Sequence, residues 1–231
     1  MQKTKKIIAY LNIIAFVIIT LVHFYLEVFS KKISVNTTGK LFVVAIQVTL
    51  LIFSYVFFRK DLDEASRKQN LRYIVIITFG IYLFNLFVLL FIDSMYGRNN
   101  QGWIWSNLDK LDIVAENSVN LIPFKGIGKI VSGVLNNNVS IKVFVTNILG
   151  NIFAFMPFAI FLKLISDRCD SIKRFILTML IIILSVEILQ LVTLRGVCDI
   201  DDLILNLSGA LLLFLILKIG IINKNIQKIR Q

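Results

Sequence analysis

The stretch RGVCDIDDLILNLSGALLLFLILKIGII, Arg195–Ile222, decides the fold class. It is apolar from Leu203 onward, and that run is long enough to cross a bilayer, because a spanning helix needs about 20 mostly apolar residues. Three carboxylates stand just before the run: Asp199, Asp201 and Asp202. Because a carboxylate deep in a membrane helix costs roughly 2.5–3.5 kcal/mol, such groups need a partner, a wet cavity or a ligand.

The whole chain repeats this apolar character. Its 231 residues are 57% hydrophobic, with a mean hydropathy of +0.81, whereas soluble domains are about 45–50% apolar. Five further runs approach spanning length: 7–29, 41–58, 71–91, 143–164 and 175–194. We therefore expect an all-α, polytopic integral membrane bundle of about six transmembrane helices, with the lipid bilayer as its main partner. The first run, although it follows MQKTKK, is expected to remain as an anchor because no small-residue cleavage site follows it.

The positions of Lys and Arg predict the orientation, because positively charged loops stay in the cytoplasm. If the N-terminus is cytoplasmic, the inner segments carry most of the charge: Lys3, Lys5, Lys6, Arg59, Lys60, Arg67, Lys68, Arg72, Lys163, Arg168, Lys173, Arg174, Lys224, Lys228 and Arg230. Both termini are then cytoplasmic, and the chain is a multi-pass protein of the cell membrane. The net charge of +11 follows from this topology and from attraction to anionic lipid, with no need for nucleic acid.

The same topology predicts four regions: spans one to three at 1–92, an extracytoplasmic loop with an interfacial amphipathic helix at 93–142, spans four to six at 143–222, and a cytoplasmic tail at 223–231. The loop helix follows from the one-sided apolar pattern Ile127, Ile130, Val131, Val134 and Leu135. It is expected either to roof the polar groups or to serve as a packed connection. Cys169 falls inside and Cys198 outside, so they cannot pair, and the sequence identifies no metal motif and no cofactor.

The polar residues of the last three spans converge in the outer half of the membrane. Asn147 and Asn151 share a helical face, Glu187 and Gln190 precede the exit of the fifth span, and the short outer turn holds Arg195. The sixth span carries one stripe: Asp199, Asp202, Asn206 and Gly209. Asp201 falls off this stripe and is expected to face water. Arg195 is expected to pair with a carboxylate, with Glu187 about two turns below it.

Structural explanations stand beside the functional ones. The amides of Asn147, Asn151, Gln190 and Asn206 also suit hydrogen bonds between helices. One aspartate in the first turn suits the helix dipole, although two on one stripe exceed that need. Gly209 favours close helix approach, and Pro157 favours a kink or a loosening of the fourth span that frees backbone groups near Asn147 and Asn151. His23 on the first span is expected to form a local polar pair with Glu27.

Four segments together resemble the VanZ-like family: NLIPF at 120–124, NILGNIFAFMPFA at 147–159, SVEILQ at 185–190 and RGVCDIDDLILNLSG at 195–209. The resemblance covers 120–209, and Ala159 departs from the glycine that is usual there. It implies membership of a membrane family named for low-level resistance to glycopeptide antibiotics such as teicoplanin. The outward-facing placement expected from the topology agrees with a target on the cell-wall side. The motif positions carried over are Asn120, Pro123, Phe124, Asn147, Asn151, Pro157, Glu187, Gln190, Arg195, Asp199, Asp202, Asn206 and Gly209.

Three classes of function fit these residues. A binding protein would hold a lipid-linked cell-wall precursor, a lipid headgroup or the glycopeptide with Arg195, Asn147, Asn151, Gln190, Asn206 and Asn120. An enzyme acting on a cell-envelope substrate would use Glu187, Asp199 and Asp202 as a carboxylate acid–base site, with Arg195 binding an anionic group. A transporter of small molecules or lipids is the third class. The sequence alone does not decide whether the site is catalytic.

Overall fold

The computed structural model describes residues 2–28, 37–59, 62–92, 119–193, 195–220 and 226. The chain divides into two compact units, one from Met1 to Val88 with Gln227–Gln231, the other from Leu89 to Ile226. Residues 93–118, most of the predicted outer loop, and most of the predicted tail lie outside the described residues.

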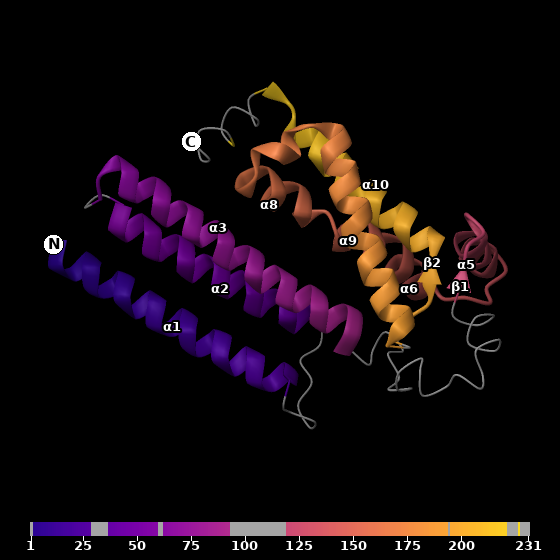
Figure 1. Ribbon diagram of the computed structural model, residues 1–231. Coiled ribbons are helices and arrows are strands. Elements are labelled where there is room, and N and C mark those ends of the chain that lie inside the picture. The colour runs from indigo at the N-terminus through magenta and orange to yellow at the C-terminus, as the bar shows by residue number, and fades with distance from the viewer. Residues whose placement is uncertain are drawn as a thin grey trace. The chain divides into compact units, whose positions relative to one another are not determined.

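The first unit consists of three long helices that lie side by side (Figure 1). They are α1 (Gln2–Val28), α2 (Thr37–Phe58) and α3 (Glu64–Phe87). Many large apolar side chains on them are exposed, among them Leu21 and Phe42 at 63% and 67%. A helix that leaves so much apolar surface uncovered is suited to lipid rather than water.

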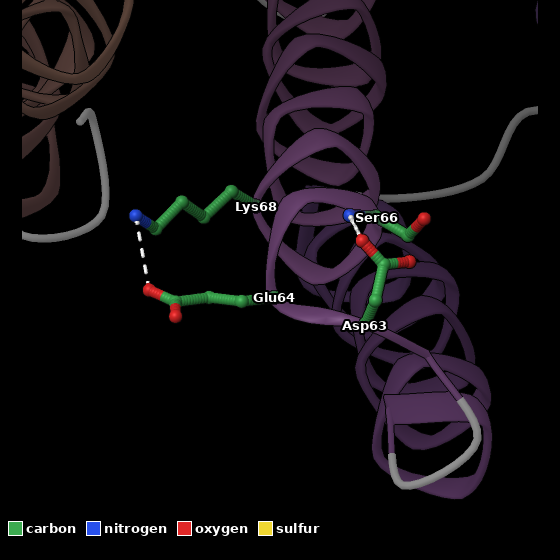
Figure 2. A network of polar contacts seen from close by, with 4 residues as sticks. All are labelled: Asp63, Glu64, Ser66 and Lys68. Atoms are coloured by element: carbon green, nitrogen blue, oxygen red, sulfur yellow. Dashed lines mark hydrogen bonds and ion pairs between the residues drawn. The ribbon is translucent and has the colours of Figure 1, made fainter.

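Helix α3 begins at a polar cap. Asp63 accepts a hydrogen bond from the main-chain N–H of Ser66 (3.3 Å), and the exposed pair Glu64 and Lys68 follows at 3.2 Å (Figure 2). The hydrogen bonds from Ser66 lower the pKa of the Asp63 carboxyl. This polar start fits a helix that begins outside the apolar layer and enters it within two turns.

The second unit contains the remaining elements. They are the π-turn η2 (Val88–Ile92, within this unit from Leu89), β1 (Val119–Asn120), α5 (Lys125–Leu135), α6 (Ile141–Phe144), the π-turn η5 (Val145–Leu149), α7 (Gly150–Ala154), α8 (Pro157–Ile165), the 3₁₀ turn η6 (Asp167–Asp170), α9 (Ile172–Val192), β2 (Cys198–Asp199) and α10 (Ile200–Leu217). The predicted amphipathic helix is present as α5, whereas its interfacial position stays a prediction.

The fourth predicted span is broken, as Pro157 indicated. Helix α7 ends at Ala154, and α8 restarts with Pro157 in its first turn, where the missing N–H of proline costs nothing. The π-turn η5 adds a second irregularity just before α7. Insertions of this kind are frequent at functional sites in helices.

The core of the second unit lies where α8, α9 and α10 meet. Phe175 of α9 stacks on Phe214 of α10 with ring centroids 4.2 Å apart, and both side chains are fully buried. Lys163, assigned to the inner positive charges by sequence, is also buried here, 3.8 Å from Asp170 and over the Phe214 ring. Burial of a lysine needs such compensation.

The membrane-bundle prediction is confirmed. Within the described residues, five helical stretches are long and apolar enough to cross a membrane: Lys6–Leu26, Glu64–Ile92, Ile141–Ile165, Ile172–Val192 and Ile200–Leu217. The second predicted span is helical in α2, with a shorter apolar part at Phe42–Phe58. The fold class is therefore an all-α polytopic membrane bundle, and the orientation of its termini stays a prediction.

Candidate functional site

A short parallel bridge joins two motifs that are far apart in sequence. Val119 pairs with Cys198, and Asn120 with Asp199, so β1 lies against β2 beside α5 (Figure 1). The bridge places the start of the NLIPF motif against the VCDIDD segment. The candidate site is built around it.

Asp199 is the centre of the hydrogen-bond network. Its Oδ1 accepts from Asn120 Nδ2 at 2.8 Å and from the main-chain N–H of Asp201 at 2.9 Å, the latter as the N-cap of α10. The main-chain N–H of Asp199 donates to Glu187 Oε2 at 3.2 Å. Glu187, only 4% exposed, thus reaches the site from α9. Three elements meet on this one residue.

The expectation that Asp201 faces water is wrong. Its side chain is 2% exposed, and its carboxylate accepts from the main-chain N–H groups of Phe124 and Ile127, the latter at 3.0 Å. These are among the amides that an α-helix leaves unpaired at its start, and negative charge is favourable there. The physical reason for the error is therefore the docking of α5 onto the start of α10.

Gly126 leaves space for these carboxylates. A Cβ atom at this position would lie 3.1 Å from Asp201 Oδ2 and 3.2 Å from Asp199 Oδ2. Both distances are tighter than ordinary van der Waals contact, so a side chain here would press on both aspartates. Sequence reasoning did not single out Gly126 or the role of Asp201, because both depend on contacts with a distant segment.

The stripe on α10 faces α7. Asp202 accepts a hydrogen bond from Asn151 Nδ2, and Gly209 packs so closely that a Cβ there would lie 1.9 Å from the carbonyl oxygen of Ile152. Asn206 lies between them on the stripe and is 3% exposed. Its Oδ1 has no hydrogen-bond partner among the described residues, and the same holds for Asn120 Oδ1.

Two predicted residues contact the π-turn η2 instead. Gln190 Nε2 donates to the carbonyl of Leu90 at 3.2 Å, and Arg195 Nη1 donates to the carbonyl of Phe91. The main-chain N–H of Arg195 also donates to Gln190 O at 2.9 Å. These contacts satisfy carbonyls at the end of the third span, and the predicted pair of Arg195 with a carboxylate stays a prediction.

Asn147 does not join the cluster. It lies in η5, is exposed, and donates from Nδ2 to the carbonyl of Val143 at 2.8 Å. The π-turn changes the helical phase between Asn147 and Asn151, so the four-residue spacing no longer holds them on one face. Of the two asparagines, only Asn151 reaches an aspartate of α10.

The pKa of the Cys198 thiol is affected by its burial and by the negative charges of the site. Partial burial raises the pKa of its thiol, and the negative charges of Glu187 and Asp199 raise it further. Cys169 is buried, and both cysteines are free thiols. Among the described residues, no cluster of three or more His, Cys, Asp or Glu side chains is arranged to hold a metal ion.

The arrangement is rich in hydrogen-bond acceptors. Its carboxylates already receive main-chain and amide donors, while Asn120 Oδ1 and Asn206 Oδ1 have none within the part of the chain that the structure describes. Such oxygens bind hydroxyl and N–H groups.

Comparison with known proteins agrees with the motifs. The model of the VanZ/LLP1 family matches residues 79–222, a range that contains 120–209 and begins in the third span. A search of curated proteins and a search of solved structures returned no match. Because the matched range includes more than half of the residues and every part of the site, the chain belongs to the VanZ/LLP1 family.

Proposed function

We propose that this VanZ-type protein lies in the cell membrane as a multi-pass protein and lowers susceptibility to glycopeptide antibiotics such as teicoplanin. It does so through the acidic and amide site at the start of α10, which faces the outer side of the membrane. The site binds, or acts on, a lipid-linked ligand of the cell envelope.

One observation carries the proposal. The Asp199 carboxylate, the Glu187 carboxylate and the Asn120 amide come from three elements and form one connected network. The buried Oδ1 atom of Asn120 has no donor among the described residues. A purely structural network satisfies its buried groups, because each unsatisfied one costs about 1–3 kcal/mol. A ligand that donates hydrogen bonds would remove this cost.

The chemistry of the site favours the headgroup of a lipid-linked wall precursor. Sugar hydroxyls and peptide N–H groups are donors for Asn120, Asn206 and the carboxylates. Arg195 carries several N–H donors in a planar fork, a geometry suited to phosphate. The lipid part of such a ligand would stay in the bilayer, beside the exposed apolar faces of α9 and α10.

A second candidate is a membrane enzyme that acts on the same ligand. The observation that favours it is the burial of Glu187, at 4% exposure, with its Oε2 turned toward Asp199. Glu187 would act with Asp199 or Asp202 as acid and base.

The test compares teicoplanin susceptibility of a sensitive host that expresses the wild type, Glu187→Gln, or Asp199→Asn combined with Asp202→Asn. Tagged protein in membranes is measured for each. Glu64→Gln is the matched control, because Glu64 is an exposed carboxylate outside the site. We expect protection by the wild type and the control and its loss in the site variants at equal abundance.

Equal protection by all variants would contradict a functional role of the carboxylates. If the wild type gives no protection, the resistance role is wrong for this protein. To separate binding from catalysis, the purified Glu187→Gln variant is tested with a lipid-linked precursor. Retained binding with loss of precursor turnover would favour the enzyme.

A further inference from the structure

The first unit contains a cavity outside the site described above. Its volume is about 170 Å³, and it lies between α1, α2 and α3. Its polar lining comes from all three helices: Thr20 and His23 from α1, Gln47 from α2 and Asn85 from α3. This space suffices for several water molecules or one small ligand group.

Gln47 is the polar centre of the cavity. Its side chain is 1% exposed, and its Nε2 donates to Thr20 Oγ1 at 3.0 Å, while Thr20 Oγ1 donates to the carbonyl of Phe16 at 2.8 Å. This chain of bonds fixes the orientation of the amide. The other amide atom, Gln47 Oε1, is buried and has no hydrogen-bond partner among the described residues. The cavity therefore presents a held acceptor that lacks a donor.

Part of the cavity wall is aromatic. The His23 ring meets the Phe84 ring edge-on at 6.0 Å, and Phe24 lies 5.5 Å from the same ring. Asn85 uses its Nδ2 on the carbonyl of Ile81 at 2.8 Å. No Asp, Glu, Lys or Arg is among the described residues that line the cavity. A charged ligand would therefore meet no Asp, Glu, Lys or Arg side chain as a counter-ion there, and burial of an unpaired charge is costly.

Gly80 is the open part of the wall. A Cβ atom at this position would meet nothing within 4 Å, so the cavity space begins at the backbone of α3. Because Gly80 is one of the lining residues, we expect a larger side chain at this position to occupy part of the cavity. The sequence thus leaves room in a helix where Ala or Leu would be better helix formers.

We propose that this cavity binds a neutral molecule with a hydroxyl group. The hydroxyl donates to Gln47 Oε1, and the carbon part packs against Phe24 and Phe84. Recognition rests on Gln47 Oε1, which has no donor among the described residues, on the aromatic part of the wall, and on a described lining without Asp, Glu, Lys or Arg. The ligand is a membrane alcohol, such as the hydroxyl end of an amphiphile, or a soluble alcohol that enters from water.

The experiment uses the full-length protein in nanodiscs with a photoreactive long-chain primary alcohol and its matched methyl ether. Labelled positions are mapped by mass spectrometry. We expect the alcohol to label residues around the cavity about fivefold more than the ether, as for one net hydrogen bond. Gly80→Leu should abolish labelling there by both probes, and Gln47→Leu should lower the alcohol signal to that of the ether.

Thr49→Val is the control, because Thr49 is exposed on the same helix as Gln47 and its hydroxyl donates to the carbonyl of Ala45 within that helix at 2.7 Å. Its labelling should equal that of the wild type. Folding of each variant is checked by elution profile and thermal unfolding. If Gln47→Leu does not fold, the proposal is tested by comparing alcohol and ether labelling in the wild type and in Gly80→Leu.

Excess glycerol separates the two sources of the hydroxyl. Protection of the cavity by glycerol supports entry from water, and alcohol labelling without such protection supports entry from the bilayer. Equal labelling by alcohol and ether, or cavity labelling that persists in Gly80→Leu, would overturn the proposal and leave the cavity to water or lipid tails.

Discussion

The carboxylate of Asp201 accepts a hydrogen bond from the main-chain N–H of Ile127, 74 residues earlier, at 3.0 Å. It thereby fixes the start of α5 to the start of α10. Phe124 supplies a second donor to the same carboxylate and has a left-handed backbone (φ 64°). The backbone thus turns sharply at Phe124 just before α5, and the buried Asp201 carboxylate holds this turn through its two hydrogen bonds. The start of α5 is thus held against α10 next to the place where β1 pairs with β2.

Asp201→Asn should destabilise the protein although it keeps the size of the side chain. One of its two polar ends would be an NH₂ group that faces a main-chain N–H donor, so a buried amide would lose its acceptor. We expect a loss of about 2–3 kcal/mol in the free energy of unfolding, measured by thermal or denaturant unfolding in detergent. Asp167→Asn, an exposed change in η6, is the control. Equal stability of both variants would contradict the capping role.

Much of the fold follows from apolar run length. The predicted spans correspond to α1, α2, α3, the broken segment α6–α8, α9 and α10, because backbone groups in lipid must be satisfied within each helix. Pro157 also located the break correctly. The π-turn η5 was not predicted, since no residue type marks it, and it moved Asn147 away from the cluster.

The site was predicted only in part. Spacing on α10 located Asp202, Asn206 and Gly209 on one face, and the structure has that face against α7. The same spacing argument predicted wrongly that Asp201 faces water. The position of a residue around α10 does not show that another segment, here the start of α5, packs on the end of that helix. The β1 and β2 bridge depends on contacts across 79 residues of sequence, which periodicity does not encode.

Gly126→Ala and Gly128→Ala form a matched pair on one helix. A Cβ at Gly128 would meet nothing within 4 Å, so alanine should stabilise α5 by about 0.5–1 kcal/mol. At Gly126 the new methyl presses on Asp199 and Asp201, and Asp201 is held by two amides. We expect that gain to disappear and teicoplanin protection to fall. Equal gains in thermal stability would contradict the crowding.

Gly209→Ala should be severe, because the added Cβ would lie 1.9 Å from a main-chain oxygen. Backbone cannot move aside as a side chain does, so α7 and α10 would have to separate. We expect a loss of about 2–3 kcal/mol in the free energy of unfolding and less folded protein in membranes. The neighbouring exposed Ser208→Ala is the control and should be close to wild type.

The predicted orientation is tested by cysteine labelling. In a background with Cys169→Ser and Cys198→Ser, single cysteines are introduced by Asn136→Cys after α5 or by Lys173→Cys at the start of α9, both exposed positions. An impermeant maleimide should label Asn136→Cys on intact cells and Lys173→Cys only after lysis, because positively charged segments remain inside. The reverse pattern would place the candidate site on the cytoplasmic side.

The thiol of Cys198 gives a direct measure of the charge on Glu187. Burial and the charges of Glu187 and Asp199 raise the pKa of this thiol, so at neutral pH it holds less reactive thiolate than an ordinary cysteine. Glu187→Gln removes one of these charges and lowers the pKa, so alkylation at a fixed, mildly alkaline pH should become about two- to fivefold faster in a Cys169→Ser background. Glu64→Gln should leave the rate unchanged. An unchanged rate in Glu187→Gln as well would mean that Glu187 carries no charge near Cys198, and the acid–base candidate would then need a protonated Glu187 as its starting state.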